Sequence, residues 1–428
     1  MMVIFLTVNA IIDVKKSNNQ QHILWITENY PPSRGGMAQS CDRIVENLKQ
    51  KNILIDIIHF MPGKHRIKAE VKAQGQYIRC YLDGDYGHAM NCLWNFIQNN
   101  PDQNYSHVVC FGGYYSMKAA PLYAAWLDKP LVTMLRGNDF DAAIFSTRKQ
   151  SVLLQALEQS TKISCVCQDM SHKVNRLIKN NKAAFIGNGI NLDHWHALPS
   201  NHSNAQRWRS KNACKDKLVL GVFGHIKLKK GVDFFLQTLQ KSGYADRIHC
   251  LLVGDFDEAV KQTLDSSPNN SPNNSLDNSL DNSQEISYSL LPFKDRYELV
   301  DYYLSCDIIA IPSFYDGMPN VLLEAGGLGI PVIASNTSGM KDLLEDGVHG
   351  YLFNPGDFNQ CRHAIYQLLN TSKKQLKSYG GALKQNIAQH YNDTIETQNY
   401  INLFNQAISK YTNETQENQN ISFGVGGP

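Results

Sequence analysis

The chain has 428 residues, more than a single hydrophobic core usually holds, so we expect two domains. Hydrophobic residues make up 43% of the sequence and charged residues 19%, a balance that excludes a chain too polar to fold. The formal net charge of +2 argues against a nucleic-acid-binding protein, because such proteins carry a marked excess of basic residues.

The N-terminal segment 1–20 is apolar at first but lacks the features of a secretion signal. It has no basic leader and no small-residue cleavage site, and Asp13 soon interrupts the apolar run. No run of about 18 apolar residues, the length that a spanning helix needs, occurs in the chain. The ten cysteines lie mostly in apolar runs without the paired spacing of zinc sites, as is typical of reduced thiols. We therefore predict an N-terminal extension on a cytoplasmic protein, with peripheral contact at the inner membrane as an alternative.

From residue 21 onward, short apolar runs alternate with helical patterns. The run HILWIT (22–27) suits a buried strand, and a helix is expected over 37–51 after the loop 28–36. Further strands are expected at 55–60, 77–82, 107–112, 130–135, 163–167 and 184–190, with helices at 116–127 and 149–160. Such alternation is typical of a parallel sheet with helices on both faces, and it predicts a Rossmann-like domain over residues 21–200.

A second series of the same kind follows a polar stretch, 196–217, that we expect to be a linker. Strands are expected at 218–224, 249–255, 287–293, 307–313, 331–335 and 350–354. These predict a second Rossmann-like domain over residues 201–385. The fold class is therefore α/β, with two doubly wound domains that face a central cleft, and ligands are expected at the carboxyl ends of the strands.

Three segments lie outside this plan. The insertion 266–284 contains the tetrads SPNN, SPNN, SLDN and SLDN, and a polar repeat of this kind is expected to be disordered. Residues 386–411 have helical spacing and are expected to close the fold. The tail 412–428 is polar and is expected to be frayed.

The stretch Pro312–Gly339 carries the strongest chemical pattern. Asp316 and Glu324 flank a Gly-Met-Pro-Asn turn that follows an expected strand and opens an expected helix. The free N–H groups and positive dipole end of a helix start suit an anionic phosphate. Glu324 lies within that helix, on a side that can face a bound ligand. The pattern predicts a site for a phosphate-bearing ligand.

Four other loops follow expected strands and contain glycine or charged residues. Glycine lets a backbone approach a ligand closely, and lysine can neutralise a diphosphate. An ordinary turn is the competing interpretation of each loop. These loops contribute Gly35 and Gly36, Arg136 and Asp139, Asn188, and His225 with Lys230.

In their order along the chain, these motifs resemble the retaining glycosyltransferases of the GT-B fold, group one (family four), over roughly residues 22–400. The specific part is PS…G-x-P-N-V-L-L-E-A from Pro312 to Ala325, continued by G-x-P-V-I-A-S from Gly329 to Ser335. The remaining motifs agree with it: Gly35-Gly36, Asn188-Gly189, Gly224…Lys230-Gly231, Ser338-Gly339 and Asp346-Gly347…Gly350.

The resemblance implies roles for the individual residues. Glu324 would hold the ribose hydroxyls of a nucleotide-sugar donor, Asp316 would lie near the donor sugar, and Lys230 and His225 would contact the diphosphate. The backbone of Gly317, Met318, Pro319, Asn320 and Val321 would contact the sugar and the diphosphate. The Gly35-Gly36 loop and Asn188 would add further contacts to the donor. Arg136 and Asp139 would lie near the donor sugar and the acceptor. Within this set, Asp316, Glu324, Lys230 and Asp139 are the predicted catalytic residues.

Three departures from the family pattern matter. His225 stands where the family usually has arginine, so one permanent charge is replaced by a conditional one. Asp316 replaces a glutamate and is one methylene shorter. Gly254-Asp255 runs on to Phe256, so the frequent G-D-G motif is absent and the usual contact to the base is in doubt.

The implied function is transfer of a sugar from a UDP- or GDP-linked donor to an acceptor hydroxyl, with retention and without metal or cofactor. The acceptor would be a glycan or lipid-linked molecule in polysaccharide, glycolipid or other glycoconjugate synthesis. The departures motivate an alternative, a catalytically weak nucleotide-sugar-binding protein. An epimerase or phosphorylase lacks a supporting pattern. The basic residues Lys64, His65, Arg66, Lys68 and Lys72 are expected to form a solvated helix, with membrane contact as the alternative.

Overall fold

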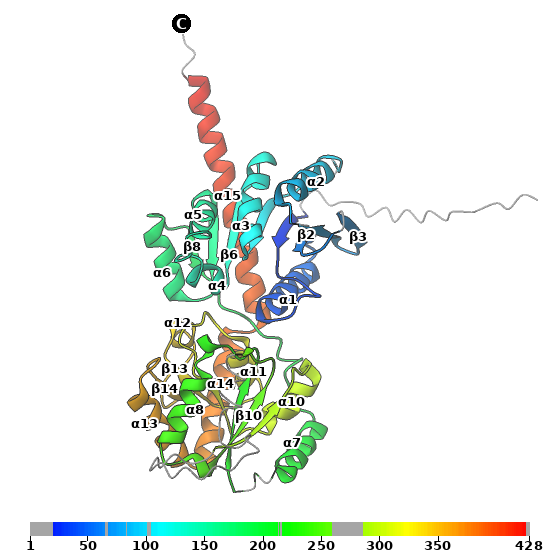
Figure 1. Cartoon of the computed structure of the whole chain (residues 1–428). Coiled ribbons are helices and arrows are strands. Elements are labelled where there is room, and N and C mark those ends of the chain that lie inside the picture. Colours follow the sequence, from blue (N-terminus) through cyan, green and yellow to red (C-terminus); the bar gives the residue numbers. More distant parts are fainter. Residues whose placement is uncertain are drawn as a thin grey trace, which may run out of the picture.

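The computed structural model describes residues 20–64, 67–82, 84–100, 104–212, 214, 216–258 and 286–424. The predictions for residues 1–19, for the insertion 266–284 and for His65 and Arg66 lie outside these residues. The described chain forms two α/β domains, one above the other in Figure 1, and the chain passes from one to the other after β8 (Ala183–Phe185). The predicted fold class is confirmed.

The N-terminal sheet has eight strands in the order β3-β4-β2-β1-β5-β6-β7-β8. All neighbours pair in parallel except β3 and β4, which are antiparallel. The central strands are buried on both faces, which explains their unbroken apolar runs. The strands are β1 His22–Thr27, β2 Leu54–Met61, β3 Lys68–Lys72, β4 Gly75–Tyr81, β5 His107–Phe111, β6 Leu131–Leu135 and β7 Lys162–Cys165, followed by β8.

Helices cover both faces of this sheet. The helix α1 (Gly36–Gln50) buries Cys41, Ile44, Val45 and Leu48, a spacing that places an apolar stripe against the strands. The others are α2 Tyr86–Gln98, α3 Tyr114–Trp126, α4 Asn138–Asp141, α5 Gln150–Gln159 and α6 Gln168–Leu177.

The C-terminal sheet has six parallel strands in the order β11-β10-β9-β12-β13-β14. They are β9 Leu218–Phe223, β10 Ile248–Val253, β11 Ser287–Leu291, β12 Ile308–Ile311, β13 Val332–Ser335 and β14 Gly350–Phe353. The helices are α7 Pro199–Lys211, η1 Leu228–Lys230, α8 Val232–Lys241, η2 Ala245–Arg247, α10 Arg296–Leu304, α11 Asn320–Gly327, α12 Ser338–Lys341, α13 Phe358–Leu369 and α14 Lys373–His390. Because β9 and β12 are neighbours, the loops that follow them meet at one edge of the sheet.

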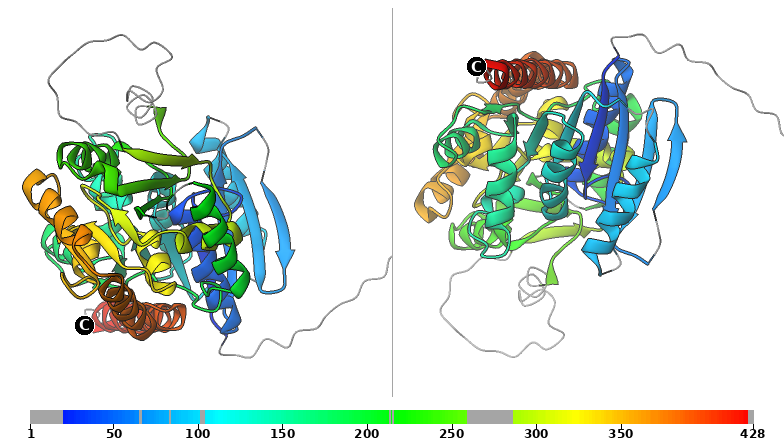
Figure 2. Two further views of the ribbon diagram at one scale, coloured as in Figure 1. Left: turned by 90° about the horizontal axis from the view of Figure 1, so that it is seen from below. Right: turned by 90° about the horizontal axis from the view of Figure 1, so that it is seen from above.

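The last helix, α15 (Asp393–Gly424), returns from the C-terminal domain and packs on α1, β6 and β7 of the N-terminal domain. It buries Tyr400, Leu403, Phe404 and Ala407, which lie on one helical stripe. Figure 2 shows α15 along one side of the molecule in both views. Where a frayed tail is predicted from residue 412, the described residues 412–424 continue α15, which projects beyond the domain in Figure 1.

The predicted linker 196–217 is also wrong over most of its length, because residues 199–211 form α7. Its polar side chains form hydrogen bonds and an ion pair with the adjacent surface of the same C-terminal domain. Asn201 and Asn204 both donate to the carboxylate of Asp301 on α10, at 2.6 and 2.7 Å, and Arg209 pairs with Asp307 at 3.0 Å. The polar composition of residues 199–211 thus indicated a loop, although hydrogen bonds to α10 and the ion pair with Asp307 stabilise a helix there.

Lys68 and Lys72, two of the basic residues expected to lie on a solvated helix, lie on the edge strand β3 instead. Glu70, at its centre, accepts ion pairs from Lys72 and from Arg79 on β4. Charged side chains of this kind are common on edge strands, where they oppose pairing with other chains. Within the described part of the chain, no helix joins the length and the apolar character needed to span a membrane.

Candidate active site

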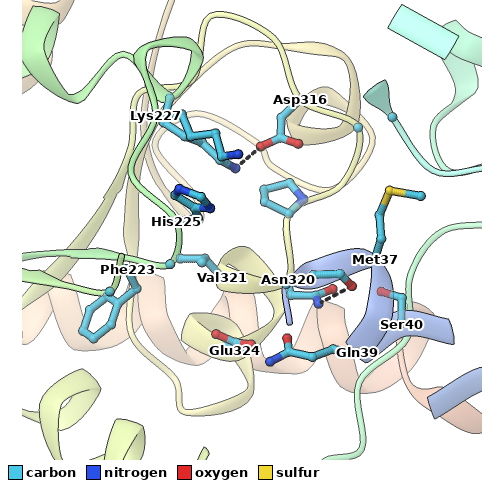
Figure 3. A pocket seen from close by; sticks show the side chains of 18 of the residues that line it. Met37, Gln39, Ser40, Phe223, His225, Lys227, Asp316, Asn320, Val321 and Glu324 are labelled. Carbon is cyan, nitrogen blue, oxygen red and sulfur yellow. Dashed lines mark hydrogen bonds and ion pairs between the residues drawn. The ribbon is translucent and has the colours of Figure 1, made fainter. Parts of the chain in front are cut away.

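A cavity of about 330 Å³ lies between the two domains. Its walls are the loops after β9, β10 and β12, the start of α11, and the start of α1 from the facing domain (Figure 3). All predicted site residues except Asp139 line it: Gly35, Gly36, Arg136, Asn188, His225, Lys230, Asp316, Gly317, Met318, Pro319, Asn320, Val321 and Glu324. The structure thus brings together loops from both halves of the sequence.

Lys230 and Asp316 form an ion pair at one end of the cavity. Lys230 ends the short helix η1 after β9, Asp316 lies in the loop after β12, and the Lys230 Nζ donates to Asp316 Oδ2. Burial alone would raise the pKa of Asp316, but the charges of Lys230 and Lys229 outweigh it and hold this pKa below its ordinary value. Asp316 is therefore ionised and Lys230 has a fixed position.

Glu324 lies in the middle of α11 at another wall of the cavity. Its Oε2 accepts a hydrogen bond of 2.6 Å from the hydroxyl of Tyr303 on α10. Burial raises the pKa of Glu324 to about 7, although the bond from Tyr303 and the charge of Arg43 act in the opposite direction. Glu324 therefore changes between its protonated and ionised forms near neutral pH.

His225 has a carboxylate partner that sequence reasoning missed. Its Nε2 lies 2.7 Å from Oδ1 of Asp257, which follows β10, and both side chains are about half exposed at the cavity rim. The sequence does show an acidic residue, Asp257, shortly after β10. It lies 32 positions from His225, however, and no sequence pattern connects the two residues.

The Gly35-Gly36 turn opens α1 directly opposite α11. Gly35 has a φ of 113°, which favours glycine, and the Gly36 carbonyl accepts a hydrogen bond of 3.4 Å from the Asn320 side chain. The N-termini of two helices therefore lie near each other across the cavity. Both present positive dipole ends to a ligand between them.

Arg136 and Asn188 are held by other protein groups. The Arg136 guanidinium donates to the Tyr400 hydroxyl at 2.6 Å and to the Asn188 side-chain oxygen. The Asn188 amide in turn donates to the carbonyl of Met318 at 2.6 Å. These side chains line the cavity, but their main contacts support the Met318 loop.

Asp139, a predicted catalytic residue, is not among the residues that line the cavity. Its carboxylate accepts from the backbone N–H groups of Arg136, at 2.8 and 2.9 Å, and of Gly137, at 2.8 Å. Burial raises its pKa to about 6, and the residue does not line the cavity. Asp139 thus closes the turn after β6, and its catalytic role stays a prediction.

One further contact across the cavity was missed. The Lys229 Nζ donates to the Asn138 side-chain oxygen at 2.9 Å, which joins the loop after β9 to the loop after β6. Among the residues that the structure describes, no three His, Cys, Asp or Glu side chains gather in a way that could hold a metal ion.

Comparison with known proteins gives a consistent result. Residues 204–385 match the family model of glycosyl transferases group 1. The chain is 24% identical over 226 residues to the capsular polysaccharide biosynthesis glycosyltransferase CapM of Staphylococcus aureus, which covers 49% of this chain and 53% of CapM. It is 37% identical over 76 residues to the sulfoquinovosyl transferase SQD2 of Arabidopsis thaliana, which covers 17% of this chain and 15% of SQD2. The chain thus aligns with about half of the first relative's length and with much less of the second.

Solved structures resemble the chain over nearly its whole length. HepE from Anabaena, solved in complex with UDP and glucose, has a TM-score of 0.69 at 16% identity and covers 90% of this chain and 99% of its own. Sucrose-phosphate synthase from Thermosynechococcus elongatus has a TM-score of 0.73 at 16% identity, and the match covers 91% of this chain and 100% of the synthase chain. The C-terminal domain is thus similar to glycosyl transferases group 1, and the whole chain shares the GT-B fold of these solved structures.

Proposed function

We propose that the protein transfers a hexose-type sugar from a UDP- or GDP-linked donor to an acceptor hydroxyl, with retention at the anomeric carbon. The observation that carries the proposal is the convergence of Lys230, Asp316 and Glu324 with the N-terminus of α11 in one cavity. A lysine and a helix start suit a diphosphate, and a carboxylate suits ribose hydroxyls. The resemblance of Pro312–Ser335 to retaining enzymes supports retention.

In this proposal the protein stabilises the departing diphosphate electrostatically. Lys230 and the N–H groups at the start of α11 face the same space, and the Gly35-Gly36 turn adds a second helix start from the other domain. These groups supply positive charge where negative charge develops. The proposed reaction therefore uses no metal or other cofactor.

The acceptor is proposed to be a glycan or lipid-linked molecule that enters from the N-terminal domain. The name of CapM, a capsular polysaccharide enzyme, supports a role in polysaccharide or other glycoconjugate synthesis. A cytoplasmic location, with peripheral contact of the inner membrane through basic residues such as Lys68 and Lys72 on β3, is part of the same proposal.

A panel of UDP- and GDP-linked sugars tests the proposal. Each donor is added to the protein, its binding is measured by thermal shift and calorimetry, and its hydrolysis or transfer by release of the nucleoside diphosphate. Donor-dependent release supports the transferase. Binding of nucleotide with no release from any donor favours the catalytically weak binding protein that Asp316 and His225 motivate. No binding of any donor contradicts both.

Replacement of Glu324 is expected to weaken donor binding. Glu324→Gln removes the charged acceptor for the ribose, and hydrogen bonds to charged groups contribute about 1.5–3 kcal/mol, so affinity should fall about ten- to a hundredfold. Calorimetry with UDP and GDP measures the change. Glu345→Gln, at an exposed position outside the cavity, is the matched control. Wild-type affinity in Glu324→Gln would remove Glu324 from the site.

His225→Arg is expected to tighten binding of UDP or GDP about three- to tenfold at pH 8. A guanidinium is always charged, whereas the imidazole is charged only when protonated. Affinity is measured by calorimetry at pH 8, with His225→Gln as the uncharged control. Equal affinities of His225→Arg and His225→Gln at pH 8 would show that this position does not face the diphosphate.

A further inference from the structure

Tyr303 lies directly behind Glu324 and contacts it through a single hydrogen bond. Its side chain is fully buried, and its hydroxyl donates to Glu324 Oε2 at 2.6 Å. Among the described residues, Glu324 Oε1 has no hydrogen-bond partner. One carboxylate oxygen is thus held by the protein, and the other is available at the cavity that Glu324 lines.

Two aromatic side chains fix the ring of Tyr303. Phe223, the last residue of β9, stacks on it with a centroid distance of 4.0 Å and an interplanar angle of 8°. Trp195, in the segment between the domains, contacts it edge-on at 5.8 Å and 89°. Phe223 also lines the cavity. A ring held on two sides places its hydroxyl at one point, so the hydrogen bond also fixes the Glu324 carboxylate.

A fixed carboxylate is a better ligand for ribose than a mobile one. A free glutamate side chain samples many rotamers and loses this freedom on binding, which lowers the affinity. A second contact that restrains the side chain beforehand removes part of this cost. Tyr303 provides that contact without itself lining the cavity.

The hydrogen bond between Tyr303 and Glu324 affects the pKa of Glu324, so it can be tested by the pH dependence of ligand binding. Burial raises the pKa of Glu324 to about 7, while Tyr303 on α10 and Arg43 on α1 act to lower it. Burial and the neighbouring Glu324 raise the pKa of Tyr303 well above its ordinary value, so its hydroxyl stays a donor. The other ionisable side chains that line the same cavity are Arg34, Arg136, Asp141, His225, Lys227, Lys229, Lys230, Asp255, Lys294 and Asp316.

We propose that Tyr303 is a positioning residue for the donor nucleotide, because its hydroxyl orients Glu324 so that Oε1 faces the ribose hydroxyls. This inference rests on the proposed function, in which the cavity binds a nucleoside diphosphate. Tyr303 does not touch the ligand. It acts through Glu324, and its removal leaves the ribose acceptor present but unsupported.

The test compares Tyr303→Phe with wild type by calorimetry, with UDP and GDP as probes from pH 5.5 to 9. The ionised carboxylate is the ribose acceptor, so wild-type affinity rises with pH through about 7. Loss of the hydroxyl removes a contact that lowers this pKa. The midpoint of the profile should therefore move about half a unit to one unit higher, with affinity at pH 7 about three- to tenfold weaker. Tyr302→Phe on the same helix is the control and should match wild type.

A measurement without ligand distinguishes failure of the proposed function from failure of the proposed role of Tyr303. The Glu324 carboxyl is titrated by ¹³C NMR in wild type and in Tyr303→Phe, with Glu324→Gln to assign the signal, and its midpoint should move upward in Tyr303→Phe. If wild type binds neither UDP nor GDP, the proposed function fails and this inference fails with it. If wild type binds, but both the affinity profile and the carboxyl titration are unchanged in Tyr303→Phe, this inference alone is overturned. An equal loss of affinity at every pH, with an unmoved titration, also overturns it in favour of a packing role.

Discussion

Lys230→Met is expected to lower kcat/KM for the sugar donor by about 10²- to 10³-fold, the range seen when one preorganised electrostatic group is removed from an active site. Lys230 ends η1 beside the start of α11, and its ion pair with Asp316 fixes its position. Its charge is thus in place before the diphosphate departs. Steady-state kinetics with the donor identified by the panel measure the loss, and Lys230→Arg, which keeps the charge, should retain more activity than Lys230→Met.

The ion pair requires a second variant, because Lys230→Met also leaves Asp316 without its partner. The double variant Lys230→Met/Asp316→Asn removes both charges. If the lysine acts on the donor, the double variant should be no faster than Lys230→Met. If the unpaired carboxylate causes the loss, the double variant should recover to the activity of Asp316→Asn alone. Lys230→Met with activity within about threefold of wild type would contradict the assigned role.

The sequence predicted this part of the site because it depends on local pattern and sheet order. Lys230 and Asp316 follow the apolar strands β9 and β12, which are neighbours in a parallel sheet. The carboxyl ends of such strands meet at one edge, so two loops far apart in sequence can be placed together without knowledge of any side-chain contact. The glycine turns before α1 and α11 were predictable for the same reason.

The residues that hold the site in place could not be predicted in this way. Tyr303 and Glu324 are 21 positions apart, and Arg136 and Tyr400 are 264 positions apart. Neither pair lies on one helix face or strand, so no periodicity connects them. Asp139 shows a different limit, since its short-range contacts with Arg136 and Gly137 look the same in sequence as a ligand-binding turn.

The errors in secondary structure have a related cause. The helix α7 and the far end of α15 are polar, and β3 is a charged edge strand. In α7 and β3, hydrogen bonds or ion pairs with a neighbouring element stabilise the segment, as with Asn201 on Asp301 and Arg79 on Glu70. Hydrophobic periodicity, the main signal in the sequence, is weak in such segments.

Glu396→Ala is expected to lower the free energy of unfolding by about 3–5 kcal/mol, the usual cost of removing one partner from a buried ion pair. Glu396 lies on α15 and is only 3% exposed. Its carboxylate pairs with Arg43 on α1 through contacts of 3.0 and 3.1 Å, and lies 3.8 Å from Arg136. Its removal leaves two arginines without this partner where α15 docks. Urea denaturation measures the loss, and Glu414→Ala, in an exposed pair on the same helix, should change the free energy by less than about 0.5 kcal/mol.

The same variant should also weaken donor binding, although Glu396 does not line the cavity. Arg136 is held by Glu396 and Tyr400 of α15, it contacts Asn188, and Asn188 donates to the Met318 carbonyl in the loop before α11. Loss of the carboxylate loosens the first member of this chain, and the loop that would cover the diphosphate loses part of its support. Asn188→Ala breaks the same chain nearer the loop and should weaken UDP or GDP binding with a smaller loss of stability. If both variants bind the nucleotide as wild type does, α15 stabilises the fold without positioning the donor loop.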